Sequence, residues 1–301
     1  MLTRARTGVT LVELLVTLTL GAIVLSLVTV VCLRQQRIFA DLANATALAG
    51  QLRDAAAILP IDLRPVASGS GDIRDARDTS LEIRGTIASA VVCDTLRGGV
   101  VLAPKVAGVE SYAGMVTALD VGDSLWLFAA TDTIDVWRAF RITAVSGAPA
   151  GACGAVAPVL DPSSRSVPRV AVTLDSTALA GWIGAPLRVT RALRYSLYRA
   201  ADGGWYLGER DWNSALARFN TIQPVSGPFL PPSPSDGGLT FRYLDSAGAA
   251  LGSPVTNPAR VALVRVDLRG KTKQSPRAVS ASATIDHFDS VSAVVLLRNR
   301  R

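Results

Sequence analysis

Residues 9–33 read VTLVELLVTLTLGAIVLSLVTVVCL, an apolar stretch of 25 residues in which Glu13 is the single charged side chain. About 20 apolar residues are enough for a helix to span a bilayer. The eight residues before the stretch, MLTRARTG, carry Arg4 and Arg6. A basic leader followed by an apolar segment predicts that residues 1–8 are a targeting leader and that residues 9–33 form a transmembrane helix.

Proteins with a secretory signal peptide and lipoproteins also begin with basic residues followed by an apolar segment. A secretory signal peptide needs small residues before its cleavage site, whereas this stretch continues through Val31 and Cys32 into Arg34. A lipoprotein would use Cys32 as the lipid acceptor, but the bulky Val31 stands where a small residue is needed. Both patterns fit the sequence poorly.

The helix is expected to continue beyond the membrane. Apolar residues recur at alternating spacings of four and three, which places them on one helix face: Ile38, Leu42, Ala45, Ala49, Leu52, Ala56 and Leu59. Pro60 is expected to end the helix at the residue before it. Residues 9–59 then form one helix about 75 Å long, whose amphipathic half, 34–59, packs under a globular head.

The remaining residues, 61–301, have the alternating patterns of strands. The sequence therefore predicts an α+β fold, with a long N-terminal helix packed on a β-rich head. Residues 124–129 and 134–143 are expected to form a hairpin around 131–133. Further strands are predicted at 187–198, 205–207, 239–244, 261–268, 280–285 and 292–297, with a flexible loop at 68–71 and a stiff Pro-rich connector at 228–236.

Composition narrows the class of protein. Hydrophobic residues make up 49% of the 301 residues and charged residues 18%, which excludes a disordered chain. The net charge of +7 leaves nucleic acid open as a partner, but the arginines are scattered among acidic residues. We expect the densest group to lie on solvated faces and nucleic acid to be an unlikely partner: Arg188, Arg191, Arg194 and Arg199.

Signals for catalysis are weak. His287 is the only histidine, and no nucleophile elbow or phosphate-binding loop accompanies it. Asp72, Asp75 and Asp78 could offer oxygen ligands to Ca²⁺, but they lack the order of a calcium loop and alternate with arginines, so a polar loop is favoured. We therefore expect no enzyme activity, no cofactor and no metal.

Glu13 is the most informative residue of the span. A carboxylate in the membrane costs about 2.5–3.5 kcal/mol on insertion scales, so it normally has a partner or reaches the interface. The span offers no cation. Cleavage after Gly8, however, would create an α-amine on Val9, four residues before Glu13.

The segment from Gly8 through Val9, Thr10, Leu11 and Val12 to Glu13 resembles the class III signal of type IV pilins and pseudopilins. Val9 departs from the family pattern, which usually has Phe there. The resemblance implies cleavage between Gly8 and Val9 by an inner-membrane prepilin peptidase, N-methylation of Val9, and assembly through Glu13 and the amine of Val9 on a neighbouring subunit. The head more loosely resembles PilW-like minor pilins and the J-type pseudopilins of type II secretion, in segments 121–123, 193–199, 238–243 and 295–299.

Two cysteines fall in the predicted head. If the head lies outside the inner membrane, the compartment is oxidising and a disulfide between Cys93 and Cys153 is expected. The alternative is two buried free thiols.

The resemblance implies a minor pilin or pseudopilin, a structural subunit that primes or joins a type IV pilus or a type II secretion pseudopilus. Its partners would be the prepilin peptidase, other pilins or pseudopilins and inner-membrane lipid. The alternative is a surface enzyme or binding module tethered by a signal anchor. Arginines flank the span on both sides, so charge does not decide orientation; the resemblance implies a cytoplasmic leader and a periplasmic head, or a head at the cell surface within a filament.

Overall fold

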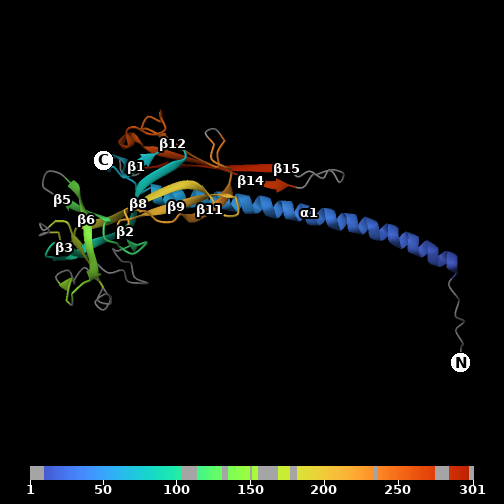
Figure 1. The fold of residues 1–301 in the computed structure, drawn as a ribbon, viewed down its shortest axis with the longest axis horizontal. Coiled ribbons are helices and arrows are strands. Elements are labelled where there is room, and N and C mark those ends of the chain that lie inside the picture. Colours follow the sequence, from blue (N-terminus) through green and yellow to red (C-terminus); the bar gives the residue numbers. More distant parts are fainter. Residues whose placement is uncertain are drawn as a thin grey trace, which may run out of the picture.

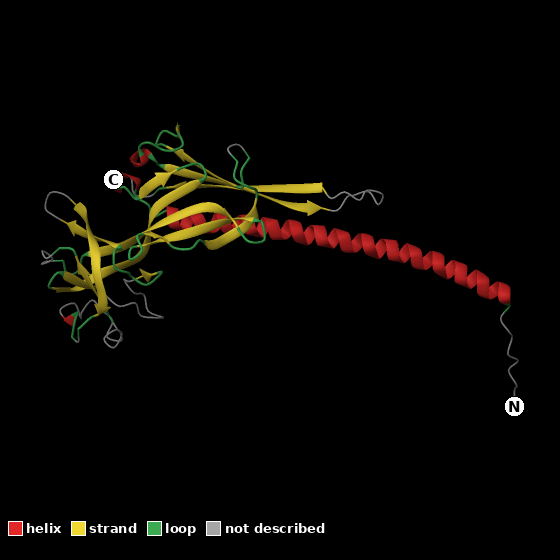
Figure 2. Cartoon of the chain, in the orientation of Figure 1, coloured by secondary structure: helices red, strands yellow, loops and turns green. Residues whose placement is uncertain are grey.

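The computed structural model describes residues 10–102, 114–130, 135–149, 151–154, 169–176, 182–233, 236–274 and 285–297. One long helix, α1 (Leu11–Leu63), enters a head built of strands, which confirms the predicted α+β class. Figure 1 and Figure 2 show the head around the C-terminal end of α1, while the rest of the helix projects away from it. The 53 residues of α1 correspond to about 80 Å.

The helix ends later than the sequence predicts. Pro60 lies inside α1, which continues to Leu63, and the Arg64 N–H donates to the Pro60 carbonyl at 3.0 Å. Proline removes one backbone hydrogen bond from a helix. Leu59 and Leu63 are both fully buried in the head, so packing of the last turn offsets that loss. The predicted end at residue 59 is therefore wrong.

The buried face of α1 also differs from the predicted stripe. Leu52 and Leu59 are buried as predicted, but Ile38 is 57% exposed and Leu42 is 62% exposed. The reason is that the first fully covered residue of α1 is Leu48. The buried helix residues are Leu48, Leu52, Ala55, Leu59 and Leu63.

The larger sheet of the head has eleven strands, all paired antiparallel. Its order is β1-β2-β3-β7-β6-β5-β8-β9-β10, with β4 on β2 and β11 on β9. The bounds are β1 Ile73–Ala76, β2 Ser80–Leu96, β3 Gly99–Leu102, β4 Gly114–Met115, β5 Ser124–Ala130, β6 Asp135–Gly147, β7 Val170–Leu174, β8 Pro186–Arg199, β9 Trp205–Asn213, β10 Arg218–Phe219 and β11 Gln223–Phe229.

An additional pairing between β2 and β8 closes six of these strands into a ring: β2, β3, β7, β6, β5 and β8. The interior of this small barrel is apolar, since every one of the six strands contributes buried side chains to a single cluster. Closing a sheet in this way removes its edges. The barrel forms the end of the head that lies farthest from the projecting helix (Figure 1).

A second sheet packs beside the helix. Its order is β13-β12-β14-β15, from β12 (Leu239–Leu244), β13 (Ala250–Leu251), β14 (Leu263–Gln274) and β15 (Ile285–Leu296). Its apolar face joins the buried face of α1 and the near halves of β2 and β8 in one core, with Tyr195, Phe241 and Tyr243 as its large buried aromatic side chains. The long strands β2 and β8 thus run from this core into the barrel and connect the two parts of the head.

Most predicted strands after residue 120 are confirmed. The hairpin β5–β6, the pair β8–β9, and strands β12 and β14 are present, although residues 131–134 at the hairpin tip lie outside the described residues. The two strands predicted at 280–285 and 292–297 are wrong in part, because one strand, β15, runs from Ile285 to Leu296 and pairs with β14 along its whole length. Residues 280–284 are not described.

Two loop predictions also change. Ser68–Ser70 form a 3₁₀ turn rather than a flexible loop, because the Asp72 carboxylate accepts the Ala67 N–H at 2.9 Å and closes the turn. The connector predicted at 228–236 begins inside β11, which contains Pro228 and Phe229.

The prediction of solvated arginines is wrong for two of them. The side chains of Arg188 and Arg191 are 14% and 6% exposed and pair with Asp72 and Asp123 at 3.1 and 2.7 Å. Arg194 pairs with Glu82 at 2.6 Å. These three guanidinium groups make contacts within the head.

Candidate functional site

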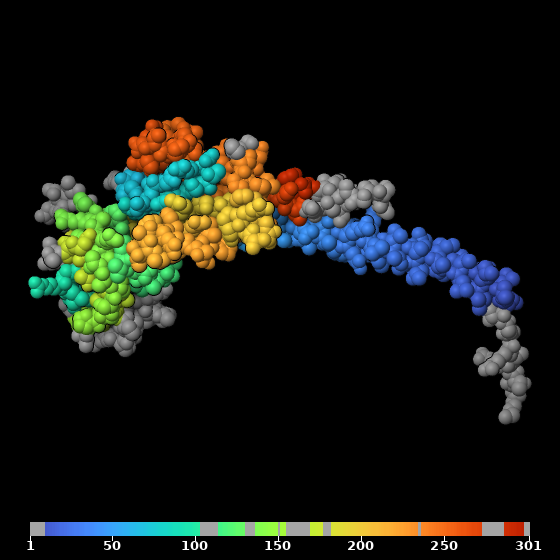
Figure 3. Space-filling view, viewed as in Figure 1, coloured from blue at the N-terminus to red at the C-terminus, as the bar shows by residue number. Residues whose placement is uncertain are grey.

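The N-terminal part of α1 has the properties of a membrane span. The helix contains an 18-residue window with a mean hydropathy of 2.6, none of which is buried within the molecule. Figure 3 shows this part of the helix as a bare rod. Residues 14–33 carry no charge. These 20 residues extend about 30 Å, which matches the hydrocarbon core of a bilayer.

The polar side chains of this segment find their partners within the helix. The hydroxyls of Thr17 and Ser26 donate to the carbonyls of Leu14 and Ile23, at 2.9 and 2.7 Å. Thr19 and Thr29 donate to carbonyls three or four residues earlier in the same way. Polar groups in lipid must be satisfied internally, so these hydroxyls are compatible with a position in the hydrocarbon core.

Glu13 lies in the first turn of α1 and caps the helix. The Thr10 hydroxyl accepts the Glu13 N–H at 3.3 Å, and a Glu13 carboxylate oxygen accepts the Thr10 N–H at 3.3 Å. This reciprocal pair is a capping box, and its signal in the sequence is Thr-x-x-Glu, which our sequence analysis missed. The carboxylate therefore faces the N-terminal end of the helix and has a local role there. The other predicted assembly residues, Gly8 and Val9, lie outside the described residues.

An apolar surface continues from the span toward the head. Arg34 and Arg37 mark the end of the uncharged segment. Beyond them, exposed apolar side chains continue along α1: Ile38 is 57%, Phe39 69% and Leu42 62% exposed. These side chains precede Leu48, the first residue of α1 that the head buries, and the head leaves them uncovered. A helix with exposed apolar side chains outside its span offers a surface for other helices.

Polar contacts fix the other end of α1 in the head. The phenol of Tyr195 in β8 lies 2.6 Å from an oxygen of Asp62 in the last turn of α1 and 3.2 Å from an oxygen of Glu209 in β9. Burial raises the pKa of Tyr195, so the phenol stays protonated and donates. Burial, followed by the charge of Asp62, also raises the pKa of Glu209.

The two head cysteines are joined in a disulfide, Cys93–Cys153, across 60 residues of sequence. Cys93 belongs to β2, and Cys153 lies in the turn after β6. Both are 1% exposed and share a small apolar cluster with Val101, Ala152 and Ala171. The Cys153 N–H donates to the Asp94 carboxylate at 3.0 Å, which fixes the turn against the strand. The third cysteine, Cys32, is a free thiol on the exposed part of α1.

The remaining candidate residues, a histidine and three aspartates, are located in the head. His287 lies in β15 opposite Thr272 of β14. Asp72 is fully buried and bound to Arg188, and Asp75 pairs with Arg77 at 2.9 Å, so these aspartates do not converge on a cation. Within the described part of the chain, no group of three or more His, Cys, Asp and Glu side chains is placed to hold a metal ion.

Comparison with known proteins agrees with this view of the N-terminus. Residues 3–29 match the family model of the prokaryotic N-terminal methylation motif. No curated protein and no solved structure matches the chain. The motif, followed by one long apolar helix and a β-rich head, fits the pilin-like proteins and indicates a membrane-anchored, single-pass structural subunit that is processed by prepilin peptidase and assembles with other pilins.

Proposed function

We propose that this chain is a minor pilin or pseudopilin that primes or joins a type IV pilus or a type II secretion pseudopilus. The observation that carries the proposal is the continuity of the methylation motif at residues 3–29 with a helix whose first 30 residues, 11–40, are all exposed. Such a helix needs lipid in the membrane and other helices in a filament. In this view residues 1–8 are removed as the leader, and residues 61–301 form the periplasmic or surface head.

Assembly is proposed to depend on Glu13 and the amine of Val9. After cleavage between Gly8 and Val9, the carboxylate of Glu13 would neutralise the N-methylated α-ammonium of Val9 on a neighbouring subunit. Two unit charges 4 Å apart attract by about 4 kcal/mol at an effective dielectric constant of 20. That attraction is large enough to offset the cost of placing the carboxylate in lipid and to set the register of the helices.

The capping box is compatible with this role. Its two hydrogen bonds are 3.3 Å long, beyond the usual range for N–H to O contacts, so they are weak. A charge-assisted bond to an ammonium is stronger than such contacts. We infer that the cap holds the carboxylate near the helix end until a neighbouring amine replaces it.

The exposed apolar surface at Ile38, Phe39 and Leu42 supports helix packing between subunits outside the lipid. These side chains lie on a part of α1 that its own head leaves uncovered. A helix of a neighbouring subunit would bury them. The head, by contrast, has its own cores and disulfide, and it would select neighbours through its surface.

Mass analysis of the N-terminus tests the proposal. We expect the mature protein to begin at Val9 and to carry one added methyl group. Gly8→Val should leave the leader in place, because the peptidase requires a small residue before the cut. An intact Met1, a lipid on Cys32, or normal processing of the Gly8→Val variant would instead support a tethered enzyme or binding module.

A further inference from the structure

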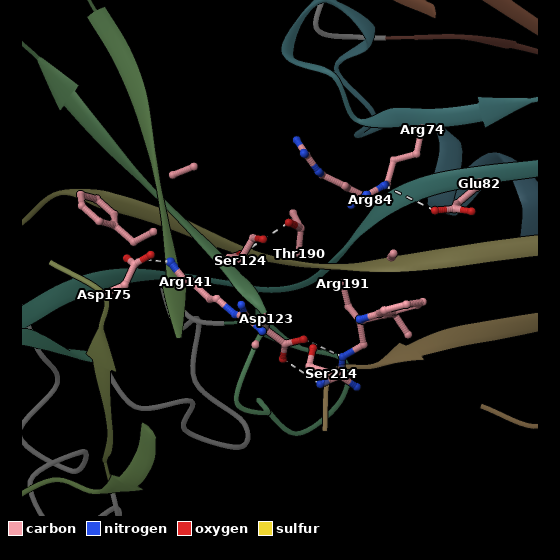
Figure 4. A pocket seen from close by; sticks show the side chains of 15 residues that line it. Arg74, Glu82, Arg84, Asp123, Ser124, Arg141, Asp175, Thr190, Arg191 and Ser214 are labelled. Carbon is pink, nitrogen blue, oxygen red and sulfur yellow. Dashed lines mark hydrogen bonds and ion pairs between the residues drawn. The ribbon is translucent and has the colours of Figure 1, made fainter. Parts of the chain in front are cut away.

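A cavity of about 460 Å³ lies where the barrel meets β1 and β9 (Figure 4). Its volume is within the range of small-molecule sites, about 300–1,000 Å³. Its lining is rich in arginine, because four different strands each contribute one guanidinium: Arg74 from β1, Arg84 from β2, Arg141 from β6 and Arg191 from β8. The two aromatic side chains that line it are Phe140 and Trp212.

Two of these arginines are neutralised by the head itself. Arg191 is buried, and its Nη2 atom lies 2.7 Å from Asp123 and 2.9 Å from Asp120. The hydrogen bond to Asp123 raises the pKa of Arg191. Arg74 pairs with Glu82 at 3.4 Å. These contacts give the two arginines structural roles within the head.

The other two arginines lack such a partner. Among the described residues, neither Arg84 nor Arg141 has a carboxylate within ion-pair distance. Asp175, which also lines the cavity, accepts the backbone N–H of Arg141 at 3.0 Å. The guanidinium of Arg84 lies over the ring of Trp126 at 5.4 Å. Burial, followed by the repulsion of Arg74, lowers the pKa of Arg84, and the negative charge of Asp72 opposes this shift.

Gly122 allows Ser214 to pack closely against the backbone beside Arg141. Gly122 has a φ of +95°, and a Cβ atom there would lie 2.2 Å from Cβ of Ser214 and 3.5 Å from Nη2 of Arg141. No larger residue fits this position. Figure 4 shows Arg141 extending toward Ser214 and Asp123, with Ser124 and Thr190 beside it. The hydroxyls of Ser124 and Ser214 thus add hydrogen-bond donors next to a guanidinium without a carboxylate partner.

We propose that this cavity binds a small soluble ligand that carries an oxyanion, a carboxylate or a phosphate, held by the guanidinium group of Arg141. A guanidinium presents a planar set of donors that matches both groups. Bound there, the oxyanion supplies the counter-charge that the head gives to Arg74 and Arg191 but not to Arg141. The aromatic rings of Phe140 and Trp212 provide apolar walls for the rest of the ligand. This activity is separate from filament assembly, because the cavity lies in the head, far from Glu13 (Figure 1).

Calorimetric titration of the full chain in detergent micelles tests this site. The probes are inorganic phosphate and succinate, each added at low ionic strength. We expect saturable binding of at least one probe, and the preferred probe identifies the class of oxyanion. Arg141→Gln should weaken binding roughly tenfold or more, because it removes charge-assisted hydrogen bonds.

Arg97→Gln is the matched control. Arg97 is an exposed arginine in the turn after β2 with no ion pair among the described residues, so its loss should leave binding unchanged. Arg141 is also exposed, so Arg141→Gln is expected to fold. The proposal is overturned if the unmodified chain binds neither probe saturably, or if Arg141→Gln binds as tightly as Arg97→Gln.

Discussion

The phenol of Tyr195 donates a 2.6 Å hydrogen bond to Asp62 across 133 residues of sequence, and it joins the end of the long helix to the centre of the head. The ring of Tyr195 is fully buried, while its hydroxyl also reaches Glu209 at 3.2 Å. Two carboxylates from different elements therefore share one donor. This contact makes the orientation of the head on the helix depend on a polar site within an apolar core.

Tyr195→Phe should destabilise the head by about 1–3 kcal/mol, because it leaves both carboxylates without their donor. Urea unfolding followed by circular dichroism measures this loss. Tyr206→Phe is the control, since Tyr206 donates to Asp202 at the exposed surface and its loss should cost little. Equal stability losses in the two variants would show that the buried hydroxyl has no special role.

The raised pKa of Glu209 predicts that the stability of the head depends on pH. Its pKa is raised in the folded state, so the folded head holds this proton more tightly than the unfolded chain does. The stability from this group is present below the unfolded pKa, about 4.3, and is lost as pH rises through the folded value. Glu209→Gln should therefore gain stability relative to the unmodified chain as the pH rises above the unfolded pKa of about 4.3. Parallel profiles of unfolding free energy against pH would contradict this expectation.

The disulfide should stabilise the head by constraining the unfolded chain. A bridge across 60 residues contributes about 4 kcal/mol in the chain-entropy model. Replacing Cys93 and Cys153 with alanine should lower the midpoint of unfolding by a corresponding amount, whereas Cys32→Ala should leave it unchanged. Alkylation of unreduced, denatured protein should label Cys32 alone, and labelling of all three thiols would remove the bridge.

Substitutions at two leucines of α1 should distinguish an effect on the stability of the head from an effect on assembly. Leu52 is 2% exposed in the core of the head, so Leu52→Ala should cost about 2–5 kcal/mol of head stability. Leu42 is 62% exposed, so Leu42→Ala should leave the isolated protein stable but reduce its recovery with other subunits. Normal co-assembly of the Leu42→Ala variant would exclude this surface from subunit packing.

Local patterns were enough to predict the helix, its membrane-spanning half and the main hairpins. Apolar runs and alternation act over short distances, so the sequence displays them directly. The Thr10–Glu13 cap was also present as a local signal. The end of the helix could not be predicted from local signals, because burial of Leu59 and Leu63 outweighs the effect of Pro60. That burial depends on strands far along the chain.

Long-range pairing explains what the sequence did not reveal. The barrel closes through β2 and β8, whose paired residues are about a hundred positions apart. Arg188 reaches Asp72 across 116 residues, and Arg191 reaches Asp123 across 68. Each of these arginines looks like a surface residue among its neighbours in sequence. Only the paired strands bring the carboxylates to them and leave Arg141 at the cavity with no ion pair among the described residues.

Glu13→Gln provides the sharpest test of the proposed assembly mechanism, because glutamine also satisfies a capping box. The variant removes the charge but retains the helix cap, whereas Thr10→Ala weakens the cap and retains the charge. Both variants should still be cleaved after Gly8.

The decisive measurement is the fraction of processed protein recovered in filaments or in crosslinked complexes with neighbouring subunits. Leaving a partner's Val9 ammonium unpaired should cost about 3–5 kcal/mol. We therefore predict that the Glu13→Gln protein is processed but remains in the membrane, while the Thr10→Ala protein assembles. Recovery of Glu13→Gln in filaments at the level of the unmodified protein would contradict docking through Glu13.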